Sequence, residues 1–282
     1  LAWSTLIGGS REDRVTDLAI DDDTDIFITG YTASADFPAR NSFDSSFNGG
    51  ASDAFVAMIK GDPASSPTLE WSAFLGGRSA ENLNVDRTSE LAGGIAISPD
   101  GVCVTGFTAS DDFPTRNALY DSYRGGASDV FVTNIRRDGS ALIWSTYLGG
   151  TAAEEAYDLA IDRRGAVYVA GHTYSADFPI ANGFDSSLQV SDAFAAKLAP
   201  DGSAIVWSTF LGHGGEEKAF GIGVDRSGNA YLTGKCESSS FPTPGGFDTS
   251  FGGGEDAFLA KISSSGSSLA WSSYLGEVGD ER

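Results

Sequence analysis

Acidic residues recur at one place along this sequence, shortly after an apolar phrase that ends in glycine. The set is Glu12, Asp13, Glu81, Glu154, Glu155, Glu216 and Glu217, followed in the last copy by Asp280 and Glu281. Ca²⁺ takes about six to eight oxygen ligands, and a ring of these carboxylates would supply ligands of that kind. No D-x-[DN]-x-[DN]-G loop is present. A solvated acidic rim that only keeps the protein soluble is therefore the competing interpretation, and the metal is left open.

A second set of carboxylates opens an apolar run in each copy: Asp53, Asp129, Asp192 and Asp256. A third set recurs upstream of it, at Asp44, Asp121, Asp185 and Asp248. Paired carboxylates carry out glycosidic chemistry, but catalysis needs one asymmetric group of residues. A residue present in every copy is better explained as a cap for backbone donors. We therefore predict structural roles for these aspartates and assign no catalytic residue.

Few reactive residues break the pattern. His172 and His213 stand where other copies have an aromatic residue or glycine, and neither has a recognisable partner. The acidic stretch Asp21–Asp25 occupies a tight turn and is interpreted as a turn rather than a metal site. No nucleophile elbow, zinc, Walker or dinucleotide motif is present.

The elements that carry these residues are copied along the chain. All five tryptophans (Trp3, Trp71, Trp144, Trp207 and Trp271) lie in phrases such as LIWSTYLGG, and their spacings are 68, 73, 63 and 64 residues. Four periods of this kind favour one repeated unit with loops of variable length.

Each period contains four short segments with strand composition, separated by turn residues. In the third copy these segments lie near residues 157–162, 167–172, 192–199 and 205–211, with DRRG as the first turn. A connection of roughly 20 residues with a repeated Phe-Pro separates the second strand from the third. A connection of that length must be ordered by its own packing, which the Phe-Pro is expected to provide.

The fold predicted from this pattern is all-β, a β-propeller of four-stranded antiparallel blades. Four repeats are present, and they form either a closed four-blade ring or part of a larger propeller. The repeats run at approximately 10–77, 78–150, 151–212 and 213–276 within a single domain or fragment, 1–282, and residues 1–9 form a surplus Trp strand.

The phrases WSTYLGG, AIDRRGAVYVAGHTYSADFP and SDAFAAKL, with their counterparts in every copy, resemble the bacterial SBBP (seven-bladed β-propeller) repeat family. The resemblance covers essentially the whole chain. It implies large exported or surface-attached bacterial proteins without one shared activity. The expected location is therefore secreted or at the bacterial cell surface.

Similarity to NHL-type blades implies that the first strand is innermost, so that the two long connections of each repeat share one face. Loops on a rigid scaffold usually carry recognition, so this face is the predicted binding face. Aromatic residues in these loops (Phe43, Tyr120, Phe184 and Phe247) are interpreted as blade packing, with sugar stacking as the alternative. The longer loops 78–93 and 62–67 are further candidate contact sites.

The charge balance limits the partners. With 18 basic and 39 acidic residues the net charge is −21, which repels phosphate backbones and argues against nucleic acid. No apolar run is long enough for membrane insertion. The two cysteines, Cys103 and Cys236, are predicted to be buried and unpaired.

Three hypotheses for function follow. The favoured one is a non-enzymatic extracellular interaction or scaffold module, which presents its acidic loop face to a surface glycan, a protein or a neighbouring subunit. The second is a carbohydrate-active propeller enzyme, a polysaccharide lyase or glycosidase. The third is a structural subunit of an extracellular assembly that self-associates through its terminal strands.

Overall fold

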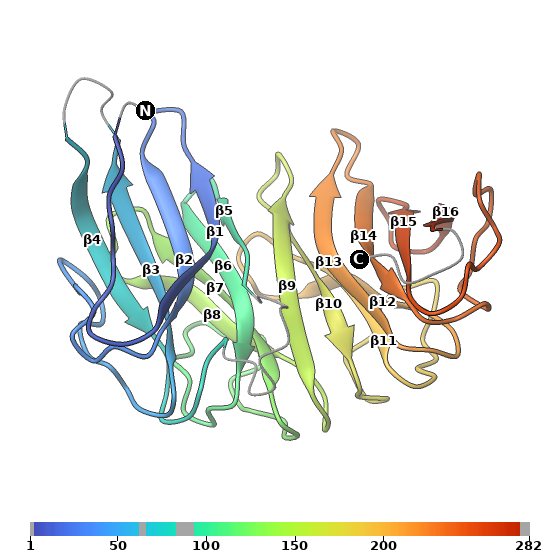
Figure 1. The fold of residues 1–282 in the computed structure, drawn as a ribbon, viewed down its shortest axis with the longest axis horizontal. Coiled ribbons are helices and arrows are strands. Elements are labelled where there is room, and N and C mark those ends of the chain that lie inside the picture. The colour runs from blue at the N-terminus through green and yellow to red at the C-terminus, as the bar shows by residue number, and fades with distance from the viewer. Residues whose placement is uncertain (1–2, 62–65, 83–92, 277–282) are drawn as a thin grey trace. The chain divides into compact units, whose positions relative to one another are not determined.

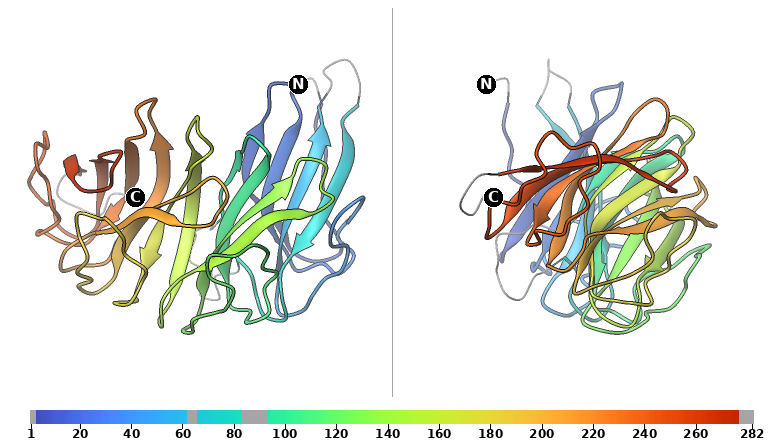
Figure 2. Two further views of the ribbon diagram at one scale, coloured as in Figure 1. Left: turned by 180° about the vertical axis from the view of Figure 1, so that it is seen from behind. Right: turned by 90° about the vertical axis from the view of Figure 1, so that its right-hand side faces the viewer.

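The computed structural model describes residues 3–61, 66–82 and 93–276. These residues form sixteen strands in four antiparallel sheets of four strands each, as Figures 1 and 2 show. The described residues contain no helix, and hence none that could cross a membrane. The all-β prediction of four-stranded antiparallel blades is confirmed.

The chain divides into two compact units. The first comprises Leu1–Tyr123 and Val130–Tyr147, and the second Arg124–Asp129 and Leu148–Arg282. The two sheets of the first unit are β1 (Asp13–Ile20), β2 (Ile26–Thr32), β3 (Asp53–Lys60) and β4 (Thr68–Leu75), then β5 (Ile95–Ile97), β6 (Gly101–Thr108), β7 (Asp129–Arg136) and β8 (Leu142–Leu148).

The second unit contains the other two sheets, each again in consecutive strand order. These are β9 (Glu154–Ile161), β10 (Val167–Thr173), β11 (Asp192–Leu198) and β12 (Ile205–Leu211), then β13 (Glu217–Val224), β14 (Ala230–Cys236), β15 (Asp256–Ile262) and β16 (Leu269–Leu275). Each sheet lies within one of the four repeats.

The first strand of a sheet begins earlier than its apolar pattern predicts. The carboxylate residues Asp13, Glu154 and Glu217 are the first residues of β1, β9 and β13, and they pair with Thr32, Thr173 and Cys236. The acidic residues predicted to lie in loops are therefore partly strand residues. Each of these three strand pairs contains a β-bulge a few residues further along, and the bulge changes the direction in which the following side chains point.

The repeated Phe-Pro orders the long connection as predicted. Phe37, Phe113, Phe178 and Phe241 are buried and lie against Phe55, Phe131, Phe194 and Phe258 at centroid distances of 4.5, 4.6, 4.7 and 4.9 Å. Each pair joins the connection to the third strand of its own sheet. Aromatic pairs at these distances add to the stability that burial provides.

Tryptophan joins neighbouring sheets within each unit. The indole N–H of Trp71 donates to the carbonyl of Arg137 at 2.7 Å, and Gly139 lies against its ring. In the second unit Trp207 does the same with the carbonyl of Ser264 at 3.1 Å and with Gly266. Both glycines have positive φ, and a Cβ there would collide with the indole. Trp71, Trp144 and Trp207 are buried, whereas Trp3 and Trp271 are half-buried.

Residues 3–9 do not form the expected surplus strand in the described structure. In the other copies the Trp strand pairs with the third strand of its own repeat. Residues 1–2 lie outside the described residues. Cys103 and Cys236 are buried and free, as predicted. Most of the two longer loops, at 62–65 and 83–92, also falls outside the described residues.

Candidate functional site

The predicted acidic rim separates into a buried row and an exposed row. Glu81, Glu154 and Glu217 are fully buried, and Asp13 is half-buried. The three glutamates therefore cannot belong to a solvated rim, and that part of the prediction is corrected. Charge in the sequence marks the loop but does not reveal which carboxylate turns inward.

Two of the buried glutamates, Glu81 and Glu154, are held by hydroxyl donors from the end of the second strand. Thr173 donates to Glu154 Oε1 at 2.7 Å, and the backbone N–H of Gly150 donates to Oε2 at 2.8 Å. Glu81 accepts hydrogen bonds from Thr108, at 2.9 Å, and from Ser110. Burial raises the pKa of Glu81 to about 8 and raises that of Glu154, although these hydrogen bonds oppose the shift.

A second buried carboxyl faces each glutamate across a glycine. A Cβ on Gly149 would lie 2.6 Å from Glu154 Oε2 and 2.7 Å from Asp129 Oδ1. Gly76 lies between Asp53 and Glu81 in the same way, and Gly212 lies between Asp192 and Glu217. Burial raises the pKa of Asp53 and of Asp129 to about 7.

These aspartates have the geometry of backbone caps. Asp53 accepts from the N–H of Asn48, Asp129 from that of Arg124 and Asp256 from that of Gly252, each at 2.7 Å. The upstream set caps turns as well: Asp44, Asp185 and Asp248 accept from the N–H two residues on, each at 2.9 Å. The acidic stretch Asp21–Asp25 also forms a turn, in which Asp21 accepts from the N–H of Asp23 and Asp25.

The pair Asp192–Glu217 departs from the pattern. Cys236 stands where Thr173 stands in the preceding sheet, and Ser238 donates to the carbonyl of His213 rather than to Glu217. Glu217 Oε1 and both oxygens of Asp192 are left buried without a hydrogen-bond partner among the described residues. Burial and the neighbouring Asp192 raise the pKa of Glu217 to about 8.

The remaining acidic residues lie nearer the surface and bind tyrosine hydroxyls. Tyr31 donates to Glu12 at 3.0 Å, Tyr157 to Glu155 at 2.9 Å and Tyr174 to Glu216 at 2.8 Å. Glu12 is exposed, and Glu155 and Glu216 are half-buried. These three residues are the part of the predicted acidic binding rim that solvent reaches.

An aromatic row that breaks the repeat runs beside this rim in the second unit. His172 stacks on Tyr157 at 5.7 Å and meets the edge of Tyr174 at 5.3 Å, and Tyr157 packs edge-on against Phe220 at 5.1 Å. Burial and the nearby Lys218 lower the pKa of His172 to about 3. The imidazole is therefore neutral at physiological pH and packs as an aromatic ring.

Candidate metal ligands do not converge in the described part of the chain. Within residues 3–61, 66–82 and 93–276, no group of three or more His, Cys, Asp or Glu side chains is arranged to hold a metal ion. The Ca²⁺ hypothesis thus rests on acidic composition alone. His213 is exposed, and its backbone N–H donates to Glu217 at 3.2 Å.

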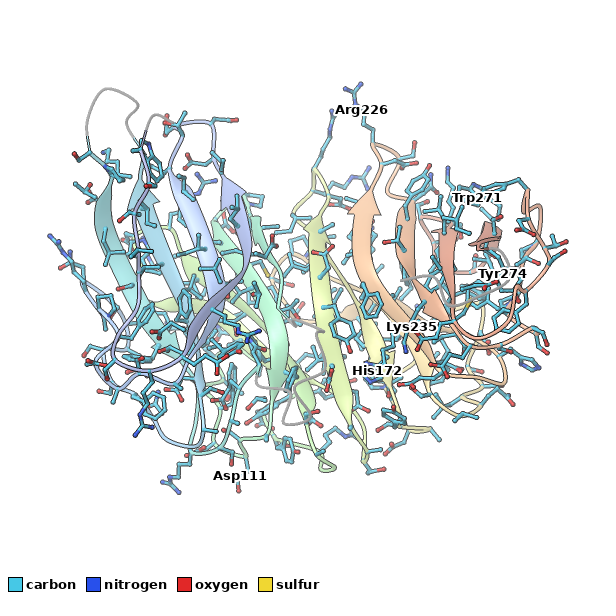
Figure 3. The ribbon with its side chains drawn as sticks, viewed as in Figure 1. Asp111, His172, Arg226, Lys235, Trp271 and Tyr274 are labelled. Carbon is cyan, nitrogen blue, oxygen red and sulfur yellow. The ribbon has the colours of Figure 1, made fainter. Side chains whose placement is uncertain are left out.

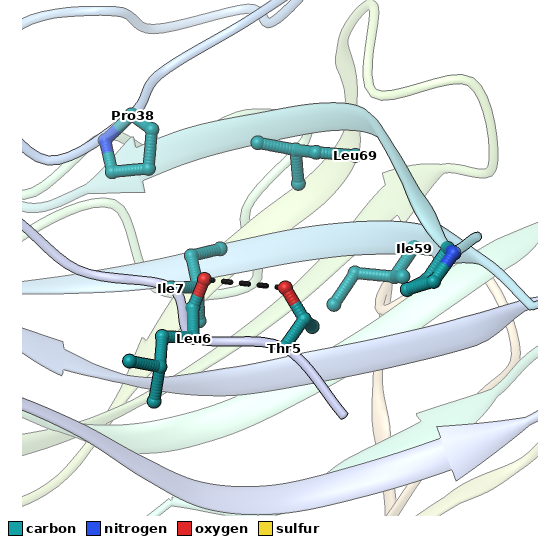
Figure 4. Close-up of a pocket in the computed structure, with 7 residues that line it drawn as sticks. Thr5, Leu6, Ile7, Pro38, Ile59 and Leu69 are labelled. Atoms are coloured by element: carbon teal, nitrogen blue, oxygen red, sulfur yellow. Dashed lines mark hydrogen bonds between the residues drawn. The ribbon is translucent and has the colours of Figure 1, made fainter. Parts of the chain in front are cut away.

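One cavity of about 210 Å³ lies in the first unit (Figure 4). It is lined by Thr5, Leu6, Ile7, Pro38, Ile59, Pro67 and Leu69. Because Ile7 packs against the core cluster around Phe55 and Ile59, this cavity is a packing gap beneath the N-terminal segment.

A second cavity, of about 330 Å³, lies at the tight hairpins of the second unit, where the sequence interpretation expected only turns. Its lining includes Arg163, Arg164 and Arg226, and Figure 3 shows Arg226 at the end of the unit opposite to His172 and Lys235. The missed signal was the basic composition of two turns in an acidic chain.

Comparison with known proteins agrees with the fold. No curated protein matches the chain. The family model described as SBBP, beta-propeller repeat, matches residues 2–38 and 143–179. The first match covers residues from the N-terminal Trp phrase to the first Phe-Pro, and the second covers the same elements around Trp144. The chain therefore carries the SBBP β-propeller repeat, at these two stretches.

Proposed function

We propose that this chain is a non-enzymatic interaction module, a β-propeller scaffold that presents one loop face to a surface glycan or protein. The observation that carries this proposal is the use of the repeated carboxylates. Glu81, Glu154, Asp53 and Asp129 are buried and bound to hydroxyl or backbone donors of the fold. Groups engaged in this way hold the scaffold together and are not available to a substrate.

The contact surface in this proposal is the exposed acidic row and its surroundings. In the second unit Glu216 accepts from the half-exposed Tyr174, and Phe247 on a long connection is 75% exposed. Glu155 is half-buried in the same unit, and Glu12 is the exposed counterpart of these residues in the first unit. The equivalent aromatic residues Phe43, Tyr120 and Phe184 pack against the core instead. An exposed aromatic ring next to carboxylates suits a sugar ring or an amide-rich protein loop.

The aromatic row at His172 is the observation that bears on the alternative function, a carbohydrate-active enzyme. A polysaccharide lyase or glycosidase needs an acid and a base that reach the substrate. His172 is 3% exposed and Tyr157 is 5% exposed, so the centre of the row is shielded from solvent. The row therefore supports a packing role better than a catalytic one.

The extracellular or cell-surface location is the expectation attached to the resemblance to SBBP repeats, and it belongs to this proposal. An assembly subunit is the further alternative. The assembly alternative is supported by exposed apolar side chains on β1, where Leu18 is 54% exposed and Ile20 is 58% exposed. The molar mass of the chain in solution distinguishes it, because a monomer excludes self-association.

The proposal is tested by offering the purified chain a panel of bacterial surface polysaccharides. Retention is measured by affinity electrophoresis, and turnover by new reducing ends and by absorbance of unsaturated products. We expect retention without turnover, weakened in a Glu12→Gln, Glu155→Gln, Glu216→Gln variant. Turnover that the His172→Phe or Tyr174→Phe variant abolishes would overturn the proposal in favour of an enzyme.

A further inference from the structure

Two tight hairpins lie side by side at one end of the second unit and enclose the cavity of about 330 Å³. They are the β9–β10 turn, Asp162–Gly165, and the β13–β14 turn, Asp225–Gly228. The cavity is lined by Asp162, Arg163, Arg164, Lys197, Asp225, Arg226, Ser227, Gly228 and Ser264. The hairpins are tied together because Tyr168 donates to the carbonyl of Gly228 at 3.0 Å.

The two carboxylates of the cavity are committed to the fold. Asp162 accepts from the N–H of Arg164 at 2.9 Å, and it pairs with Lys197 at 3.2 Å. Burial opposes its ionisation, but these hydrogen bonds outweigh burial and lower the pKa of Asp162. Asp225 accepts from the side-chain amide and the backbone N–H of Asn229, which lowers its pKa to about 2. Both turns are thus built on ionised aspartates that need no further cation.

The three arginines, by contrast, have no counter-charge. Arg163, Arg164 and Arg226 are exposed, and none of them makes a side-chain hydrogen bond or ion pair with the described part of the chain. Asp162 faces Lys197, and Asp225 lies 3.7 Å from Lys261, so the arginines add three positive charges without an ion-pair partner to a cavity in a protein of net charge −21.

This basic character is not a property of the repeat. The equivalent turn between β1 and β2 is the acidic stretch Asp21–Asp25, and that between β5 and β6 is Ser98–Gly101, with no basic residue. The turn geometry itself is satisfied without arginine, because Asp21 makes the same backbone hydrogen bonds as Asp162. Fold stability therefore does not account for the three arginines.

We propose that this cavity binds an acidic sugar unit, with the arginines on its carboxylate or sulfate group and Ser227 and Ser264 beside its hydroxyls. Guanidinium groups bind such planar or tetrahedral anions through paired N–H donors. The volume is near the lower end for ligand sites, which fits one sugar ring better than a long polymer. The strongly negative net charge also disfavours a long phosphate polyanion.

The inference rests on the proposed role in glycan contact. It places this contact at the hairpin end of the second unit, whereas Glu155 and Glu216 lie at the opposite ends of β9 and β13. The two can therefore fail separately. The test uses isothermal titration calorimetry on the full chain with trigalacturonate, a sulfated galactose trisaccharide and the uncharged galactose trisaccharide. The charged pair distinguishes carboxylate from sulfate as the bound group.

We expect at least one charged trisaccharide to bind and the neutral one to bind at least about tenfold more weakly. The variant Arg163→Ala, Arg164→Ala, Arg226→Ala should lose at least about tenfold in affinity, with an unchanged melting temperature because the side chains are exposed. The matched control Arg116→Ala removes an exposed arginine outside the cavity and should leave the affinity unchanged. Rising salt should weaken binding to the unsubstituted chain and have little effect on the triple variant.

Three results would overturn the inference. The first is no heat from any trisaccharide at millimolar concentration. The second is equal affinity in the triple variant and the unsubstituted chain. The third is a fall in molar mass in the triple variant, reproduced by Asp22→Lys, Asp23→Lys in a chain that keeps its arginines, with trisaccharide binding unaffected. This result would assign the cavity to the acidic hairpin of a second copy. Loss of polysaccharide retention by the loop-face variant alone would leave the cavity proposal intact.

Discussion

Two buried carboxyl pairs in the second unit show how one substitution changes a repeated structure. In the pair Asp129–Glu154, hydrogen-bond donors satisfy every carboxylate oxygen except Asp129 Oδ1. In the pair Asp192–Glu217, three oxygens are buried without a donor among the described residues. For Glu217 Oε1 the cause is local, because Cys236 replaces the threonine that would bind this oxygen. The comparison indicates that these pairs serve the scaffold, and that their stability depends on the hydroxyl donor.

The largest expected effect is on the pH dependence of stability. The folded chain raises the pKa of Asp53 and Asp129 to about 7 and of Glu81 and Glu217 to about 8. Between about pH 4 and pH 8 the folded state therefore binds more protons than the unfolded state, and the free energy of unfolding falls as pH rises. We expect a loss of several kcal/mol in urea denaturation from pH 5 to pH 9, at about 1.4 kcal/mol for each unit of pKa shift. A stability that rises over this window would contradict the burial of these groups.

The second effect concerns the glycine between the paired carboxyls. Gly149→Ala would place a Cβ 2.6 Å from Glu154 Oε2, so we expect a loss of about 3 kcal/mol in the free energy of unfolding. The control is Gly223→Ala in the same unit, where a Cβ would meet nothing within 4 Å. Equal stability of the two variants in urea denaturation would show that the pair tolerates displacement.

The third effect separates the two pairs. Thr173→Val removes the hydroxyl that donates to Glu154 Oε1 and accepts from the buried backbone N–H of Ser175, and the loss of these two hydrogen bonds costs about 2 kcal/mol. The exposed Thr233 on β14 provides a matched control, and Thr233→Val should change the free energy of unfolding by less than about 0.5 kcal/mol. Thermal and urea denaturation measure both, and similar values for the two variants would argue against the hydroxyl as a stabilising donor.

The smallest effect is a gain. Cys236→Thr should provide Glu217 Oε1 with the donor that Glu154 already has, and should stabilise the chain by about 1 kcal/mol. Cys236→Ser tests the hydroxyl without the methyl group and should give part of this gain. A destabilised Cys236→Thr variant would mean that the thiol is better suited to its buried site than the hydroxyl.

Much of the fold could be predicted from the sequence because the repeat copies its strands, turns and Phe-Pro connections four times. The phrase around each tryptophan and the Asp-x-x-Gly turns mark the ends of strands by their composition alone. Residues 3–9 are the exception, since a strand needs a partner and not only the right residues. Their composition matches the other Trp strands, but in the described structure residues 3–9 pair with no strand.

The candidate sites were less predictable, because acidic character does not show which carboxylate is buried. The hydroxyl pattern gives that information: Thr108 and Ser110, like Thr173 and Ser175, end the second strand opposite a glutamate. The arginine cavity was missed for a related reason. A tight turn follows the first strand in every repeat, and only the residues within the turn differ: Asp21–Asp25 and Ser98–Gly101 contain no basic residue, whereas Asp162–Gly165 and Asp225–Gly228 do.

The most direct test of the structural role of the carboxyl pairs is a double-mutant cycle on Glu217 and Cys236. We expect Cys236→Thr to stabilise the chain by about 1 kcal/mol when Glu217 is present, and to give no gain in a Glu217→Met background, which has no carboxyl to accept the bond. The free energies of unfolding of the four proteins, measured in urea at pH 6, give the coupling. A coupling of zero would contradict the account, because the introduced threonine would then act on stability without binding Glu217.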